Sequence, residues 1–334
     1  MNLLKDIKRA SFRHKNNKLE YYLVNYICQY IPASFFQKQL EKKLSLLNKM
    51  DAGYIYRRVE YYNRLKEITI LPQGIKQPLE YNLREHQKTY IFDTYEYTRF
   101  FPPHLKIAPL FGDITHVPDI PSITKSRPIE GDNANSILLK LDKIRHFLFI
   151  NDRNDFEKKK NMLIGRAKAY QEHRIRFLNM YINHPMCNIG QVNRNINPQF
   201  IRGRLTIEEH LKYKFILCLE GNDVASNLKW VMSSNSIAVM PKPKYETWFM
   251  EGTLIPNYHY ILIKDDYSDL ESQLNYYIEH TGEALQIIEN AHQYIEQFKD
   301  KTQEDIIALL VLKKYFEKTG QNFSLVSDES VIQK

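Results

Sequence analysis

Two carboxylates in one loop are candidates for a general base. Asp113 follows the apolar run Leu110-Phe111, and Asp119 lies later in the same loop, closer to Lys125. A carboxylate just after an apolar segment can accept the proton of a hydroxyl whose oxygen attacks a carbon centre. His116, a residue type that titrates near neutral pH, could act as the base or bind a sugar. Spacing alone leaves the choice between Asp113 and Asp119 open, and each could instead be a solvated or capping side chain.

The basic cluster after this loop suits binding better than proton transfer. Lys125, Ser126 and Arg127 combine two cations with a hydroxyl group. Such groups can hold a phosphate or a polar acceptor through charge-assisted hydrogen bonds. We therefore expect these three residues, together with His116, to bind the acceptor.

A second segment has the features of an anion-binding site. The apolar run Phe215–Leu219 predicts a central strand of a parallel sheet, followed by a turn at Gly221 and a helix capped by Asn222 or Asp223. Free N–H groups at such a helix start attract a diphosphate. An ordinary strand-to-helix crossover with a surface lysine would show the same pattern. The residues expected at the anion are Gly221, Asn222, Ser226, Asn227 and Lys229.

Paired aspartates were considered as metal ligands. Asp152 and Asp155 lie in a charged segment, and Asp265 and Asp266 follow a predicted strand. Neither pair forms an Asp-x-Asp triplet at a strand end facing the proposed site. We predict no metal and no other cofactor, so helix starts and cations would neutralise a leaving diphosphate.

A longer stretch of the chain resembles a known family. The runs EGNDVASNLKWVMSSNSIAVM, YETWF and YHYILIKDDYSDLESQL are similar to glycosyltransferase family 90, and the resemblance extends over residues 155–295. That family includes the CAP10-like enzymes, the protein O-glucosyltransferases and the bacterial lipopolysaccharide core glycosyltransferases. The likeness is greatest to the bacterial enzymes.

The resemblance implies a GT-B-like α/β enzyme in which two Rossmann-type domains face a cleft, with extra N- and C-terminal helices. It implies an inverting transfer of a hexose, glucose or galactose, from a UDP-sugar to a hydroxyl of the lipopolysaccharide or lipooligosaccharide inner core. Asp113 is then the base, because the family's base follows a strand-like run. Gly165 and Arg166 match a family glycine and arginine near the donor diphosphate, and Lys168 is the alternative cation.

The elements that must position these residues divide the chain into four expected parts. These are an N-terminal helical segment at 1–50, an acceptor domain at 51–150, a donor domain at 151–300, and a C-terminal helix and tail at 301–334. Short strands are predicted at Ile68–Leu71, Lys88–Phe92 and Met162–Ile164. Helices are predicted at Leu270–Tyr277, Glu283–Phe298 and Glu304–Phe316.

The charge balance indicates an anionic partner. The chain has 47 Lys and Arg against 39 Asp and Glu, a formal charge of +8 and a pI near 9.0. A UDP-sugar, a phosphorylated core or an anionic membrane would account for it. We expect no nucleic-acid partner, because no recognised nucleic-acid motif is present. A nucleic-acid-binding protein and a catalytically inactive sugar-binding protein of the same fold are the rival interpretations.

The first residues of the sequence indicate where in the cell the protein is expected. Residues 1–9 carry charges too early for the apolar core of a secretory signal, so we expect a cytoplasmic protein. Peripheral contact with the inner membrane is expected from the acceptor. A helical stripe could lie on the inner leaflet, although packing on the protein body is the simpler interpretation. That stripe is formed by Leu19, Tyr22, Leu23, Tyr26 and Ile27.

Overall fold

The chain folds into two compact units. The computed structural model describes residues 14–81 and 86–323. Unit 1 comprises residues 1–17, 145–244 and 250–297, and unit 2 comprises 18–144, 245–249 and 298–334. Each unit therefore draws on segments that are far apart in the sequence, and each is described by itself below.

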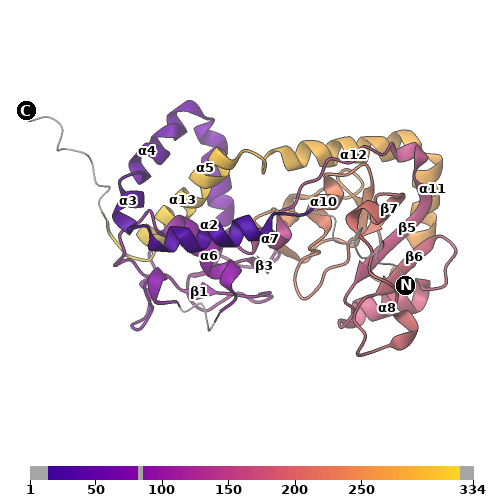
Figure 1. The fold of residues 1–334 in the computed structure, drawn as a ribbon, viewed down its shortest axis with the longest axis horizontal. Helices are drawn as coiled ribbons and strands as arrows, with labels where there is room; N and C mark the ends of the chain where they lie inside the picture. Colours follow the sequence, from indigo (N-terminus) through magenta and orange to yellow (C-terminus); the bar gives the residue numbers. More distant parts are fainter. Residues whose placement is uncertain (1–13, 82–85, 324–334) are drawn as a thin grey trace, which may run out of the picture. The chain divides into compact units, whose positions relative to one another are not determined.

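Unit 1 is built around a five-stranded parallel sheet (Figure 1). Its strand order is β10-β8-β7-β5-β6, so β7 is central, as its apolar run predicted. Phe215 and Ile216 of β7 are fully buried, as expected for a strand that is covered on both faces. The strands are β5 (Lys160–Ala167), β6 (Cys187–Gln191), β7 (Tyr213–Leu217), β8 (Ile237–Met240) and β10 (Ile261–Leu262).

Helices pack on this sheet through apolar faces. Phe177 of α8, Leu274 of α11 and Ile287 of α12 lie in one buried core with Phe215. The helices predicted at 270–277 and 283–298 are confirmed as α11 and α12. The helical elements of unit 1 are α8 (Glu172–Tyr181), α9 (Ile207–His210), α10 (Leu228–Met232), α11 (Leu270–Glu279), α12 (Thr281–Glu296), η3 (Phe156–Lys158), η4 (Pro198–Phe200) and η5 (Glu251–Thr253).

The strand order creates a switch point between β5 and β7. From β5 the chain moves to β6 on one side, and then returns to β7 on the other side. In open α/β sheets, ligands bind at such a point, outside the carboxyl ends of the strands. In unit 1 these ends lead into the loops after Ala167 and after Leu217.

Unit 2 contains a smaller parallel sheet and most of the long helices. β1 (Pro109–Leu110), β2 (Ser122–Thr124) and β4 (Ser136–Leu138) are parallel, in the order β1-β2-β4. Helix α13 packs against α5 and α6. The helical elements here are α2 (Lys18–Tyr30), α3 (Ala33–Gln37), α4 (Leu40–Ser45), η1 (Leu46–Lys49), α5 (Ala52–Tyr62), η2 (Pro78–Glu80), α6 (Lys88–Thr98) and α13 (Lys301–Lys318), while α7 (Lys143–His146) spans the boundary at residue 144.

Two predicted strands of this region were wrong. Residues 88–92 begin helix α6, whose Tyr90, Ile91 and Phe92 are all buried. Residues 68–71 are irregular, and Ile68 and Ile70 are exposed. A short apolar run does not distinguish a strand from a buried helix segment, because both can be continuously apolar.

The aromatic segment after β8 joins unit 2. β9 (Tyr245–Thr247) pairs antiparallel with β3 (Ser126–Pro128). Trp248 is buried beside it, stacks on Tyr62 with ring centroids 3.8 Å apart, and donates a 2.7 Å hydrogen bond to Glu304. The sequence analysis had assigned this segment to the donor domain.

Some expectations fall outside the described residues. The expected absence of a secretory signal rests on residues 1–9, which are not described, and neither is the end of the expected C-terminal tail, residues 324–334. Over the part of the chain that the structure describes, no helix combines the length and apolar character needed to cross a bilayer.

Candidate active site

Arg174 joins the two loops at the switch point of unit 1. From the first turn of α8 it donates 2.7 Å hydrogen bonds to the carbonyls of Lys168, after β5, and of Leu219 and Glu220, after β7. Burial lowers the pKa of Arg174 to about 10, so it is still protonated at neutral pH. The arginine holds these two loops together at the place where a ligand of this fold would bind.

Exposed cations lie on the segments that follow the strands of this sheet. The side chains of Lys168, Arg176, Lys244 and Lys264 are exposed, and each lies on a loop or helix that follows a strand of the sheet. Helix α8 begins here with Glu172, and the first N–H groups of a helix of this length can bind an anion. The edge is suited to a diphosphate.

Other polar groups of the loops are held in place by hydrogen bonds. Gln171, at the N-cap of α8, donates a 2.7 Å bond to Asn222, and the backbone N–H of Lys244 donates to Glu220 (2.9 Å). His173 bonds the Glu220 carbonyl at 2.8 Å, and burial lowers its pKa, so its ring is neutral at pH 7. The loops after β5, β7 and β8 therefore form one connected rim.

Several predicted donor residues lie on this rim. Lys168, Asn222 and Ser226 are exposed, and Gly221 is half-buried beside the Arg174 guanidinium. The Asn227 amide donates a 3.0 Å bond to the Leu217 carbonyl at the end of β7. No role was predicted for Arg174, although its place in the first turn of the helix that follows β5 was a signal for one.

The expected position of Lys229 was wrong. Helix α10 begins at Leu228, not after Asp223, and has only five residues, so it offers no extended anion site. Lys229 is fully buried, and its ammonium lies 2.6 Å from Glu251, which is 1% exposed. The apolar spacing of 224–232 predicted a longer helix, but the residues before 228 form turns instead.

Gly165 and Arg166, which were expected near the donor diphosphate, contact other parts of the protein instead. A Cβ on Gly165 would lie 3.0 Å from Cβ of Leu217, so glycine permits the close approach of β5 and β7. The Arg166 guanidinium donates to the carbonyls of Gly165, Asn188 and Gly203 and to the Asn188 amide oxygen, at 2.7 to 3.0 Å. These contacts use most of its donors. The cation accessible after β5 is therefore Lys168.

In unit 2, Asp113 lies just beyond the carboxyl end of β1. Its carboxylate is 30% exposed and pairs with the Lys125 ammonium, whose side chain is 2% exposed. Gly112 precedes it with φ +124°, a conformation that L residues rarely adopt. The Ser126 hydroxyl holds the other side of the loop, through bonds to the N–H and carbonyl of Ile114. The loop thus presents a fixed, accessible carboxylate.

The predicted acceptor-binding cluster is mostly internal. Arg127 is fully buried, pairs with Glu246 at 2.8 Å and donates to the carbonyls of Tyr61 and Ser136. Ser126 is also buried, and Lys125 lies beneath Asp113. The expectation that these three side chains contact the acceptor directly is corrected, because their polar atoms are used to hold β3 and the Asp113 loop.

His116 and Asp119 line a pocket of unit 2. Its volume is about 530 Å³, and its walls include Tyr81, Leu110 and Val117. Both His116 and Asp119 are exposed. An aromatic ring, an imidazole and a carboxylate around one hollow are groups that suit a sugar. Acceptor binding by His116 stays a prediction.

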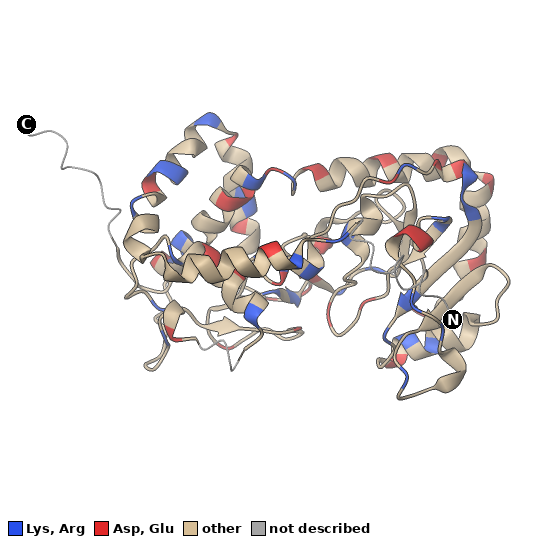
Figure 2. Ribbon diagram, viewed as in Figure 1, with Lys and Arg blue, Asp and Glu red and all other residues tan. Residues whose placement is uncertain are grey.

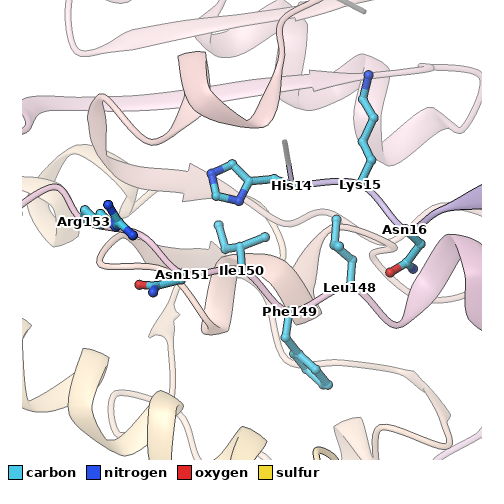
Figure 3. Close-up of a pocket in the computed structure, with 8 residues that line it drawn as sticks. All are labelled: His14, Lys15, Asn16, Leu148, Phe149, Ile150, Asn151 and Arg153. Atoms are coloured by element: carbon cyan, nitrogen blue, oxygen red, sulfur yellow. The ribbon is translucent and has the colours of Figure 1, made fainter. Parts of the chain in front are cut away.

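Unit 1 has a different pocket, away from the donor rim. Figure 3 shows His14, Lys15 and Asn16 on one segment, and residues 148–151 with Arg153 on another. The pocket that they line has a volume of about 380 Å³. His14 contacts Glu208 of α9 (3.1 Å), which precedes β7, and the Ile150 N–H bonds Ser233, which precedes β8. This pocket therefore lies toward the amino ends of the strands, opposite the switch point.

Possible metal ligands were sought throughout residues 14–81 and 86–323. That part of the chain holds no group of three or more His, Cys, Asp and Glu side chains placed to bind a metal ion. Asp152 is instead paired with Lys159 at 2.6 Å, and Asp266 accepts hydrogen bonds from Ser268. Independence from metal stays a prediction.

A five-stranded parallel sheet with helices packed on it, and with basic side chains on the loops at its switch point, defines an α/β protein. The sequence of residues 153–317 matches glycosyl transferase family 90. The chain is 39% identical over 304 residues to the O-glucosyltransferase LpsA of Dichelobacter nodosus, across 90% of this chain and 95% of that protein. The chain belongs to glycosyltransferase family 90 and is a glycosyltransferase.

Proposed function

We propose that this glycosyltransferase transfers a hexose from a UDP-sugar to a hydroxyl group, with inversion at the anomeric carbon. The donor diphosphate would bind at the rim of unit 1, between the start of α8 and the loop after β7. Lys168 and the N–H groups of α8 supply positive charge there. The name of the relative, an O-glucosyltransferase, favours glucose over galactose as the hexose.

Asp113 carries the proposed chemistry. Its carboxylate is accessible, while the lysine that holds it is buried. In the reaction it accepts the proton of the acceptor hydroxyl, as that oxygen forms a bond to the anomeric carbon. The bond from that carbon to the diphosphate breaks, and UDP leaves with the electron pair. Positive charge at the donor rim stabilises the UDP that is released.

The proposed acceptor is a hydroxyl of a lipopolysaccharide or lipooligosaccharide inner core. The pocket beside the Asp113 loop, lined by Tyr81, His116 and Asp119, has the groups to hold a sugar ring. We also propose a cytoplasmic location, with peripheral contact with the membrane that carries the acceptor.

The first experiment tests donor and base together. UDP release is measured from UDP-glucose and UDP-galactose, with and without a truncated core acceptor, and the anomer of the product is read by NMR. Asp113→Asn is expected to lower kcat by at least about 100-fold, the usual range for a lost general base. Its affinity for UDP should stay within about two-fold of the wild type, because Asp113 is not on the donor rim.

Asp119→Asn is the matched control, since it changes a second exposed carboxylate of the same loop. It should raise the acceptor KM and retain kcat. Full transfer by Asp113→Asn, together with loss of transfer by Asp119→Asn, would reverse the assignment of the base. Activity in excess EDTA tests the predicted independence from metal.

A further inference from the structure

Helix α2 has an outward face that is almost entirely apolar. Leu19, Leu23, Val24, Ile27 and Tyr30 are between 51% and 88% exposed. At 3.6 residues per turn they fall within one continuous arc of the helix surface. Figure 2 shows α2 without charged residues over most of its length. A contiguous apolar surface of this kind marks an interaction site.

The opposite face holds α2 firmly on unit 2. The Tyr21 hydroxyl donates a 2.7 Å hydrogen bond to Asp93 of α6, and Tyr22 and Tyr26 pack edge-on against Phe92. The stripe predicted from the sequence is therefore divided: its tyrosines face α6, while its aliphatic residues face outward. The helix is anchored by one side and displays the other.

One cation lies beside the apolar arc, and two more lie at the start of the helix. Lys88 of α6 donates a 2.8 Å hydrogen bond to the Tyr26 hydroxyl, and its ammonium is exposed. Lys18 lies in the first turn of α2, and Lys15 precedes it. Glu20, the one acidic residue of the helix, is exposed and falls within the arc by the same 3.6-residue repeat, between Ile27 and Val24. Aliphatic side chains with lysines at their edge match the surface of an anionic bilayer, where apolar groups enter the interface and lysines meet lipid phosphates.

We propose that the outward face of α2 docks this protein on an anionic lipid bilayer, with the helix lying in the plane of the interface. A stable protein dimer uses about 20–30 residues from each partner, far more than this arc supplies. A bilayer needs no complementary surface, because each inserted apolar side chain adds to binding by itself. Docking on a bilayer agrees with the proposed lipid-linked acceptor, but it is inferred from the exposed apolar residues of α2 and not from the acceptor.

The test places a reporter on the helix. Leu23→Trp is mixed with vesicles that contain phosphatidylglycerol, and its fluorescence is compared with that of the wild type. We expect a shift to shorter wavelength, as the indole enters the apolar interface, and a much smaller shift with vesicles of phosphatidylcholine alone. Ile68→Trp is the control, since Ile68 is 65% exposed but lies in the loop after α5. An equal shift in both variants would overturn the proposal.

Two further variants measure affinity. Leu19→Ser/Leu23→Ser/Ile27→Ser should weaken sedimentation with anionic vesicles by at least about ten-fold while thermal unfolding is unchanged. Lys88→Ala should weaken it a few-fold, and high salt should abolish that difference. If the triple variant binds vesicles as the wild type does, or only turns a dimer into a monomer, the proposal fails. Transfer to a soluble acceptor should be normal in all of them, which separates this test from that of the proposed function.

Discussion

The carboxyl ends of the two parallel sheets each have a lysine–carboxylate pair nearby, and the two pairs differ in burial. The exposed side chains at the rim of unit 1 include the cations Lys168, Lys244 and Lys264, and also Asp265, which lies 3.7 Å from Lys244. Lys229, the lysine that was predicted to bind the diphosphate, is buried with Glu251 at 2.6 Å. At the small sheet of unit 2 the accessible group is a carboxylate, Asp113, and the lysine paired with it is the buried partner. In the Lys229–Glu251 pair both charged groups are buried, whereas in the Lys125–Asp113 pair only the lysine is buried.

This difference separates a structural ion pair from a functional one. Removing one member of a buried pair leaves a charge without its partner in a poorly solvated place, so the fold depends on both members. Removing Lys125 leaves Asp113, which water already reaches. The Lys229–Glu251 pair should therefore affect stability, and the Lys125–Asp113 pair should affect activity.

The largest expected effect is on the unit 1 pair. Glu251→Gln should lower the free energy of unfolding by about 3–5 kcal/mol, because Lys229 then lacks its carboxylate in the interior. Chemical denaturation followed by circular dichroism measures this. Lys229→Met/Glu251→Leu should recover most of the loss, since an apolar pair needs no solvation. A loss below about 1 kcal/mol for Glu251→Gln would remove the distinction between the two pairs.

Asp93, a fully buried carboxylate of unit 2, should make the stability of the protein depend on pH. Asp93 accepts hydrogen bonds from the Tyr21 hydroxyl and the Lys143 N–H, yet burial raises its pKa to about 6 from an ordinary 3.8. The folded state therefore holds this proton more tightly than the unfolded state does. The stabilisation is present below about pH 4 and is lost as the pH rises to about 6, by about 3 kcal/mol in total.

The Asp93→Asn variant isolates this contribution. Its stability relative to the wild type should rise by about 3 kcal/mol between pH 4 and pH 7, because the amide cannot ionise. Urea midpoints at several pH values give the difference. A difference that does not change with pH would mean that Asp93 is not the group responsible.

The smallest expected effect concerns the cation beneath Asp113. Lys125→Met should lower kcat about 10- to 100-fold, equivalent to about 1–3 kcal/mol, since the carboxylate loses the partner that positions it. UDP affinity and unfolding should change little. Lys125→Arg should restore part of the activity if charge is the requirement. A stability loss as large as that of Glu251→Gln would contradict the distinction.

Much of unit 1 was predictable from the sequence. Parallel strands buried on both faces are continuously apolar, so the run Phe215–Leu219 identified the central strand β7 directly. The later helices α11 and α12 followed from their apolar periodicity. The strand order and its switch point depend on which strands pair, and a sequence does not state long-range pairing. The same holds for Tyr245–Phe249, whose membership of unit 2 is set by pairing with β3.

The candidate site was predictable in position but not in detail. Asp113 and the loop after β7 were identified, and both lie at carboxyl ends of parallel strands. The error came from the cations Lys229, Arg166 and Arg127, which sequence reasoning assigned to ligands and the fold uses internally. The sequence shows that a lysine or arginine is able to bind an anion. Which anion it binds, such as the carboxylate of Glu251 or Glu246, depends on tertiary contacts.

The path of the backbone limits how this enzyme can be divided. The chain passes from one unit to the other before Lys18, after Ile144, on both sides of Tyr245–Phe249, and after Gln297. A fragment cloned as residues 145–297 would carry Trp248 and Phe249 without Tyr62 and Phe298, their aromatic partners. Neither unit is a single continuous segment that could be cloned alone. Exchange of donor specificity with a relative would therefore need grafted loops rather than swapped domains.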